Sequence, residues 1–176
     1  MARSRGWKVG LDCFSPALAQ MVGQDLAQLS ACWDWIKGMV YLRAFGPTAI
    51  PFELVGLADA LHSPGAADDR EVLEFLARCT GWEPPSTREE IRRSRLPSSI
   101  LAAEIARGRE ACGCPFLTGV ELVEIPDVAE IDPVGIQKDW EALAAAPDGI
   151  VLSWDLRHMP VERLEMVNRI LFHPQT

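Results

Sequence analysis

The fold is decided by Ile150-Val-Leu-Ser-Trp-Asp-Leu-Arg-His-Met-Pro160, in which a short apolar run reaches a charged residue and then a proline. Such a run is typical of a strand buried on both faces of a parallel sheet, and a proline near the first helical position favours a following helix. The pattern recurs in three other segments, which are Lys8-Val-Gly-Leu-Asp-Cys-Phe-Ser-Pro16, Trp35-Ile-Lys-Gly-Met-Val-Tyr-Leu-Arg-Ala-Phe-Gly-Pro47 and Gly119-Val-Glu-Leu-Val-Glu-Ile-Pro126. The sequence therefore predicts four βα units.

The helices between these strands are indicated by apolar spacing, caps and breakers. More than fifty residues, from His62 to Pro115, pass without a convincing strand, which predicts a helical insertion after the second strand. Within it, a capping box is expected at Ser86 with Glu89 or at Thr87 with Glu90. The expected helices cover residues 16–31, 52–61, 69–79, 98–112, 134–146 and 161–171.

Four βα units fit either an open doubly wound sheet or half of a (β/α)₈ TIM barrel, because a whole barrel takes about 250 residues. No GxGxxG or GxxxxGK[ST] loop follows any of the strands, and charged residues occur on every strand rather than at one switch point. The chain has 176 residues, of which 48% are hydrophobic, enough for a sizeable core. We predict one α/β domain over residues 1–176, a half or incomplete TIM barrel with its helical insertion at about 62–115.

Composition and charge argue against several classes of partner. The net charge is -8, whereas a general nucleic-acid binder needs basic residues to neutralise the phosphate backbone. The first six residues lack the apolar stretch of a signal peptide, and no run approaches the roughly 20 apolar residues of a membrane span. The five cysteines show no metal-ligand spacing and are expected to be reduced thiols. We expect a cytoplasmic protein with no nucleic-acid or membrane partner, no cofactor and no metal.

Side chains alternate between the two faces of a strand, which assigns the polar residues of these segments to one interior. In the third strand, Glu121 is expected to point into the barrel, with Glu124 at its rim. A buried carboxylate is costly unless it is paired or functional, so Glu121 is either catalytic or ion-paired with Lys37 or Arg43. The other candidates near strand ends, where barrels carry their chemistry, are Asp12, Tyr41, Arg43, Trp154 and Asp155.

Two of these candidates have structural alternatives. Asp155 faces inward near the end of its strand, where it binds a ligand or serves as a cap or salt bridge for the following loop. Trp154 is either a sugar-stacking platform or a packing residue. Alternation turns Trp154 away from the interior, so a bulge is needed to make it a platform.

Three segments resemble the later strands of glycoside-hydrolase-like TIM barrels, including uncharacterised bacterial ones: Val9-Gly-Leu-Asp-Cys-Phe-Ser-Pro16, Asp34-Trp-Ile-Lys-Gly-Met-Val-Tyr41 and Gly149-Ile-Val-Leu-Ser-Trp-Asp-Leu156. The resemblance implies a nucleophilic glutamate at the end of strand seven, an aromatic sugar platform at the end of strand eight and an acid/base glutamate on strand four. Counted back from the C-terminus, strand seven carries Glu121 or Glu124 and strand eight carries Trp154. Strand four would precede Met1, so the acid/base is expected to be missing from this chain.

The leading hypothesis is therefore a retaining glycoside hydrolase, as a fragment or half-barrel, that acts on or binds carbohydrate. Such hydrolysis uses two carboxyl groups about 5 to 5.5 Å apart. Here Glu121 is the nucleophile oriented by Tyr41, Asp155 or Asp12 binds sugar hydroxyls, and Trp154 stacks on a sugar face. A second half-barrel or a second copy is the expected partner, and the chain alone is expected to be weakly active or silent.

Two other functions fit the same residues. A lysine inside a barrel can have its pKa lowered by burial, so Lys37 would form a Schiff base in a lyase or aldolase. Alternatively, the chain is a non-catalytic carbohydrate-binding or structural half-barrel that completes another chain's barrel through its edge strands. Borohydride trapping with a carbonyl ligand distinguishes the lyase or aldolase from the other two functions. Carbohydrate binding without turnover favours the non-catalytic half-barrel.

Overall fold

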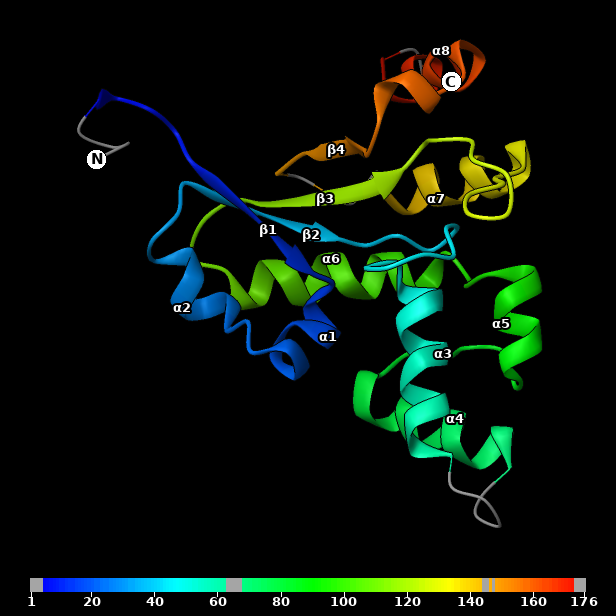
Figure 1. Cartoon of the computed structure of the whole chain (residues 1–176). Helices are drawn as coiled ribbons and strands as arrows, with labels where there is room; N and C mark the ends of the chain where they lie inside the picture. The colour runs from blue at the N-terminus through cyan, green and yellow to red at the C-terminus, as the bar shows by residue number, and fades with distance from the viewer. Residues whose placement is uncertain (1–4, 63–67, 144–145, 147, 173–176) are drawn as a thin grey trace.

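The computed structural model describes residues 5–62, 68–143, 146 and 148–172. Its centre is a sheet in which every pairing is parallel and the strands lie in sequence order (Figure 1). The prediction of four parallel strands in sequence order, and of an α/β fold, is confirmed. The strands are β1 (Gly10–Phe14), β2 (Trp35–Met39), β3 (Phe116–Glu121) and β4 (Ile150–Ser153).

The first crossover is more broken than its apolar stripe predicts. In place of one helix over 16–31, the chain forms α1 (Pro16–Ala19), a 3₁₀ turn η2 (Gln20–Val22) and α2 (Leu26–Ser30). Gly23 ends η2 in the left-handed region at φ 77°, which a residue without Cβ adopts without strain. Asp25 then starts α2 by accepting a hydrogen bond from the backbone N–H of Gln28. Gln24, between them, accepts the backbone N–H of Phe14 through Oε1 at 2.8 Å.

The predicted helical insertion is confirmed. Between β2 and β3 the described residues form helices, with no strand of the sheet among them. The capping box lies at Thr87 and Glu90, one of the two predicted alternatives, and starts the third of these helices. The insertion and its preceding helix comprise α3 (Ile50–Leu61), α4 (Asp69–Thr80), α5 (Arg88–Ser94) and α6 (Ser99–Ala111).

The last two helices lie at their predicted positions. Helix α7 (Pro133–Leu143) joins β3 to β4, and α8 (Val161–Phe172) follows a short 3₁₀ turn, η3 (Leu156–His158). Arg163 of α8 is buried, and its guanidinium donates to the backbone carbonyls of Val123 and Ile131, each at 2.8 Å. This fork fixes α8 against the chain that leaves β3.

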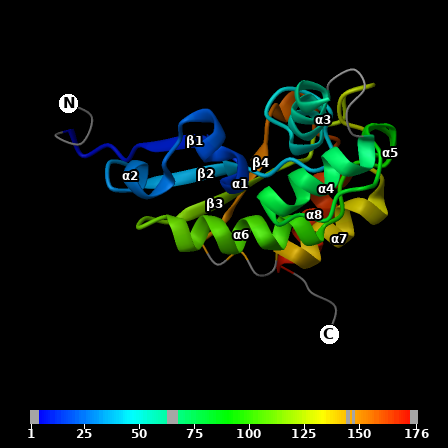
Figure 2. The same cartoon turned by 90° about the horizontal axis from the view of Figure 1, so that it is seen from below.

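The helices pack on one another in the same order as the strands. Helix α1 contacts α6, α6 contacts α7, and α7 contacts α8. Helix α6 contacts β3 and runs beneath the sheet in Figure 1, and it follows the direction of β3 in the view from below (Figure 2). At this contact the ring of Phe116 lies between Gly38 of β2 and Gly108 of α6, because neither glycine has a Cβ to occupy that space. The face of the sheet that carries Gly38 and Phe116 is therefore the helix-covered face.

The apolar interior divides into a large and a small cluster. The large one lies between the sheet, the insertion and helices α7 and α8, and its fully buried side chains include Ile50, Leu54 and Leu101. The small one lies under β1 and β2. It consists of Cys13, Ala19, Leu26, Ile36 and Phe116.

Candidate functional site

A cleft of about 570 Å³ opens on the sheet face opposite α6. Its floor is made by side chains that alternate along the strands with the helix-facing ones. The loop that follows β2 forms one wall, and the end of β4 forms the other. The residues that line it are Asp12, Lys37, Met39, Tyr41, Gly46, Pro47, Thr48, Ala49, Val128, Val151, Leu152, Ser153 and Trp154.

Lys37 and Asp12 form an ion pair on the cleft floor. Lys37 Nζ lies 2.7 Å from Asp12 Oδ2 and 3.5 Å from Ser153 Oγ. The lysine side chain is only 11% exposed, whereas that of Asp12 is 61% exposed, so the carboxylate presents its free edge to solvent. Gly119 makes room for the lysine, since a Cβ there would come within 3.1 Å of Lys37 Cε.

The charge state of Lys37 follows from its neighbours. Burial opposes the charged form, but the hydrogen bond to Asp12 and the charges of Tyr41 and Asp12 outweigh it, so the pKa of Lys37 is raised above its ordinary value. The expectation that the pKa of this lysine is lowered is therefore wrong, although burial by itself acts in that direction. Lys37 is therefore an ammonium at neutral pH, a hydrogen-bond donor rather than a nucleophile.

An aromatic pair stands at the mouth of the cleft. The ring centroids of Tyr41 and Trp154 are 5.6 Å apart with their planes tilted by 57°. Tyr41 is buried, and Trp154 is 44% exposed. Alternation turned Trp154 away from the interior, but β4 ends at Ser153, so the rule no longer applies at the next residue and the indole lines the cleft.

Glu121 is buried at the end of β3 and does not line the cleft. Its Oε1 accepts the backbone N–H groups of Arg43 and Ala44, the latter at 2.9 Å. The ion pair considered with Lys37 or Arg43 is therefore replaced by bonds to the backbone of the loop after β2. Burial, together with the nearby charge of Asp139, raises the pKa of Glu121 to about 7.

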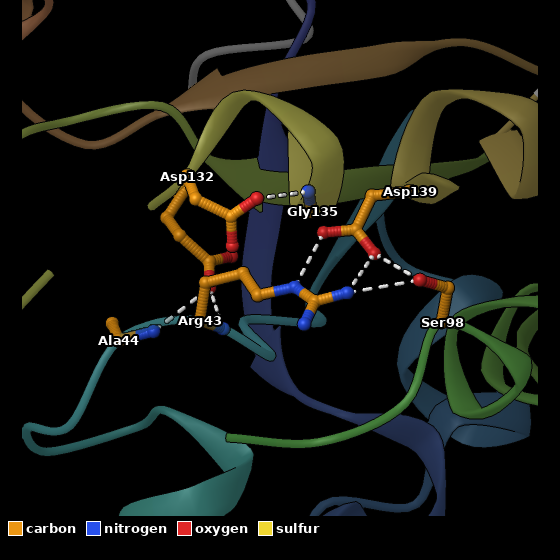
Figure 3. Close-up of polar contacts among 7 residues, drawn as sticks. Arg43, Ala44, Ser98, Asp132, Gly135 and Asp139 are labelled. Carbon is orange, nitrogen blue, oxygen red and sulfur yellow. Dashed lines mark hydrogen bonds and ion pairs between the residues drawn. The ribbon is translucent and has the colours of Figure 1, made fainter. Parts of the chain in front are cut away.

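Arg43 directs its side chain toward α7 rather than into the cleft (Figure 3). Its guanidinium donates to both carboxylate oxygens of Asp139, at 2.7 and 2.9 Å, and to Ser98 Oγ at 2.9 Å. Ser98 in turn donates to Asp139 at 2.6 Å. Arg43 thus ties the loop after β2 to α7 and to the start of α6.

The remaining two candidates also have partners outside the cleft. Glu124 pairs with Arg163 at 2.6 Å. Asp155 caps η3 by accepting the backbone N–H of Arg157, and it pairs with the guanidinium of the same residue at 2.7 Å. These contacts with Arg157 hold the pKa of Asp155 down to about 2. Asp155 therefore has the structural role that was the alternative to ligand binding, that of a cap and salt bridge for the loop after β4.

Of the predicted residues, the structure brings Asp12, Tyr41 and Trp154 together, and it adds Lys37 to them. The loop from Gly46 to Ala49 and Ser153 were missed as site residues. Ser153 could have been found, because it shares a strand face with Val151 at the C-terminal end of β4. Nothing in the strand pattern indicated that the loop after β2 folds over the sheet.

Among the residues described, no group of three histidine, cysteine, aspartate or glutamate side chains is placed to hold a metal ion. In the same part of the chain, every helix is too short or too polar to cross a membrane. No protein-family model, curated protein or solved structure matches the chain. The geometry of the cleft is therefore the basis for a functional proposal.

Proposed function

We propose that this chain is a half (β/α)₈ barrel of the glycoside-hydrolase-like type that binds carbohydrate in the cleft. The half-barrel is supported by the sequential parallel strands, by the matching order of the helices α1, α6, α7 and α8, and by the cleft on the opposite face, which the loop after β2 covers in part. Parallel sheets are normally covered on both faces. A sheet with one open face that carries polar side chains is what half of a barrel presents.

The observation that carries the carbohydrate proposal is the exposed indole of Trp154 beside an ion pair that offers both donors and acceptors. A pyranose has an apolar C–H face and a rim of hydroxyls. The apolar face stacks on a half-exposed indole. The free edge of Asp12 accepts from hydroxyls while Lys37 donates to them, and such convergent polar groups orient a ligand in a pocket.

Binding is better supported than hydrolysis by this chain alone. The retaining mechanism uses two carboxyl groups about 5 to 5.5 Å apart. Among the described residues that line the cleft, Asp12 carries the one carboxyl group, and it is paired with Lys37. Glu121 is engaged with backbone N–H groups outside the cleft. A second carboxyl group would have to come from the half that completes the barrel.

The Schiff-base function of Lys37 is disfavoured by the raised pKa of that lysine, since only the neutral amine attacks a carbonyl. We expect borohydride with glycolaldehyde or pyruvate to leave Lys37 unmodified, as judged by intact mass and peptide mapping. Reduction of an adduct on Lys37, absent in Lys37→Arg, would instead establish the lyase or aldolase alternative.

The test is calorimetric titration with a panel of soluble oligosaccharides that differ in sugar and linkage. Trp154→Ala is expected to weaken binding of the best ligand by about tenfold or more, a loss of about 1.4 kcal/mol or more in binding free energy. Trp7→Ala is the matched control, because Trp7 is 59% exposed and does not line the cleft. Equal effects of the two variants, or no binding by any member of the panel, would refute the proposal.

A further inference from the structure

The sheet has two open edges in the part of the chain that the structure describes, at its outer strands β1 and β4 (Figure 1). Val9 directs its carbonyl to the β2 side, so the alternate residues Gly10 and Asp12 direct their backbone groups outward. At the other edge, Ile150 and Leu152 do the same, since their neighbours in the strand bond to β3. Unused backbone groups of this kind are templates for another strand.

The floor of the cleft contains half of a barrel layer. In a (β/α)₈ barrel, each layer is made of four side chains that come from alternate strands. Lys37 of β2 and Ser153 of β4 meet in this way, with Nζ 3.5 Å from Oγ, past Gly119 of β3, where a Cβ would crowd the lysine. A second copy of the chain would supply the same two side chains. Asp12 offsets the charge of Lys37 within each copy, so two copies bring no unpaired lysine into the layer.

Helix α8 lies at the β4 edge without a strand to cover. In this fold a helix packs on the strand that follows it, as α2 contacts β2 and α6 contacts β3. Among the described residues, no strand follows α8. Its Val161 is 63% exposed, and at the β1 edge Met21 and Val22 of η2 are roughly half exposed. The helix layer therefore presents apolar side chains beside both open edges.

We propose that two copies of this chain close one eight-stranded barrel around the cleft, with β4 of each copy paired in parallel with β1 of the other. This inference rests on the proposed function, because it names the partner of the half-barrel. Two such contacts, related by a twofold axis, use both edges of both copies. The assembly therefore closes at two chains and leaves no edge for a third.

The register of the new contact follows from the geometry of such barrels. A path across the paired residues starts at Phe14, the last residue of β1, and reaches β4 at Val151, before the end of that strand. Two equal halves share a shear of about 8 residues, so the path enters the second copy about four residues before its start, at Gly10. Ser153 then lies beside Asp12 of the second copy, which adds a carboxyl group to the cleft. The ladder ends there, because the next outward N–H, that of Phe14, is already bonded within its own chain.

Two measurements without carbohydrate test the closed pair. In the first, sedimentation equilibrium at several protein concentrations should give twice the mass of one chain. Val161→Glu should halve this mass, because its charge would be buried against the second copy. Val134→Glu is the matched control and should keep the doubled mass, because Val134 is 62% exposed on α7, between α6 and α8. A single-chain mass for the wild type at every concentration, or a mass above two chains, would overturn the proposal.

The second measurement, amide hydrogen exchange, locates the contact. The amides of Asp12 and Leu152 should exchange about tenfold or more slowly in the wild type than in Val161→Glu. Phe14 is the internal control, since its N–H bonds to Gln24 in the same chain and should exchange alike in both proteins. If Val161→Glu does not fold, dilution of the wild type gives the same comparison. A dimer with equally fast exchange at residues 12 and 152 would be formed by another surface and would overturn the proposal. Carbohydrate titration is a separate readout, so a failure of binding leaves the doubled mass and the exchange pattern unchanged.

Discussion

Replacing Gly108 with alanine tests how closely α6 packs on the sheet. A Cβ at Gly108 would lie against the ring of Phe116, 2.6 Å from Cδ1. The ring cannot move away, because it is 2% exposed and its other side lies against Gly38, where a Cβ would be 2.8 Å from Cε2. Overpacking of this kind costs about 1 to 3 kcal/mol, whereas alanine in place of glycine stabilises a helix by about 1 kcal/mol. We expect a net destabilisation of up to about 2 kcal/mol.

The assay is urea unfolding followed by circular dichroism, with Gly56→Ala as the matched control. Gly56 lies in α3, is exposed, and would have nothing within 4 Å of an added Cβ. The control should therefore gain about 1 kcal/mol from helix propensity alone. Combining Gly108→Ala with Phe116→Leu should cost less than the sum of the two changes. If Gly108→Ala is as stable as Gly56→Ala, the ring is not confined and the reasoning fails.

Three further predictions concern stability. The folded-state pKa of Glu121, about 7, lies above the ordinary value of 4.5 for a glutamate. The protonated form of Glu121 therefore favours the folded protein. It contributes about 3 kcal/mol to the free energy of unfolding, which is fully present below about pH 4.5 and is lost as the pH rises through about 7. In Glu121→Gln, the urea midpoint should no longer depend on pH in this range. Arg163→Lys should be destabilised nearly as much as Arg163→Met, by about 1 to 3 kcal/mol in urea unfolding. The reason is that an ammonium group cannot donate to two separate carbonyls as the guanidinium does. If Arg163→Lys is as stable as the wild type, the positive charge alone is what matters. Thr87→Ala should lose about 1 kcal/mol in the same assay, with Ser86→Ala nearly neutral, and the reverse order would assign the capping box to the wrong residue.

The strand order could be predicted because each strand signal is local. An apolar run that ends in a polar residue and a proline identifies one βα unit, and consecutive units that pair in parallel give the observed sheet. The break after α1 was not predicted, because the apolar stripe continues through it. The left-handed turn at Gly23 and the cap at Asp25 divide this segment into two short helices of four and five residues. Helices this short gain little from continued helical periodicity, so the local turn and cap decide the structure.

Strand alternation predicted the part of the candidate site that the strands themselves form. Asp12 and Lys37 are neighbours across adjacent strands, so alternation placed both on one face. Glu121 was also placed inward, but its partners are the backbone N–H groups of Arg43 and Ala44, whose loop folds back over β3. Strand periodicity contains no information about such a loop. Trp154 lies one residue beyond β4, where periodicity no longer applies.

The hydrogen bond from Phe14 to Gln24 makes the two edges of the sheet unequal. At β4, the carbonyls of Gly149 and Ser153 accept from β3, so the alternate residues Ile150 and Leu152 direct their backbone groups outward. At β1, the last outward N–H is already used by the glutamine side chain. Uncontrolled fibre growth would join β4 of one molecule to β1 of the next. Gln24 shortens the ladder of backbone groups that β1 offers for that contact.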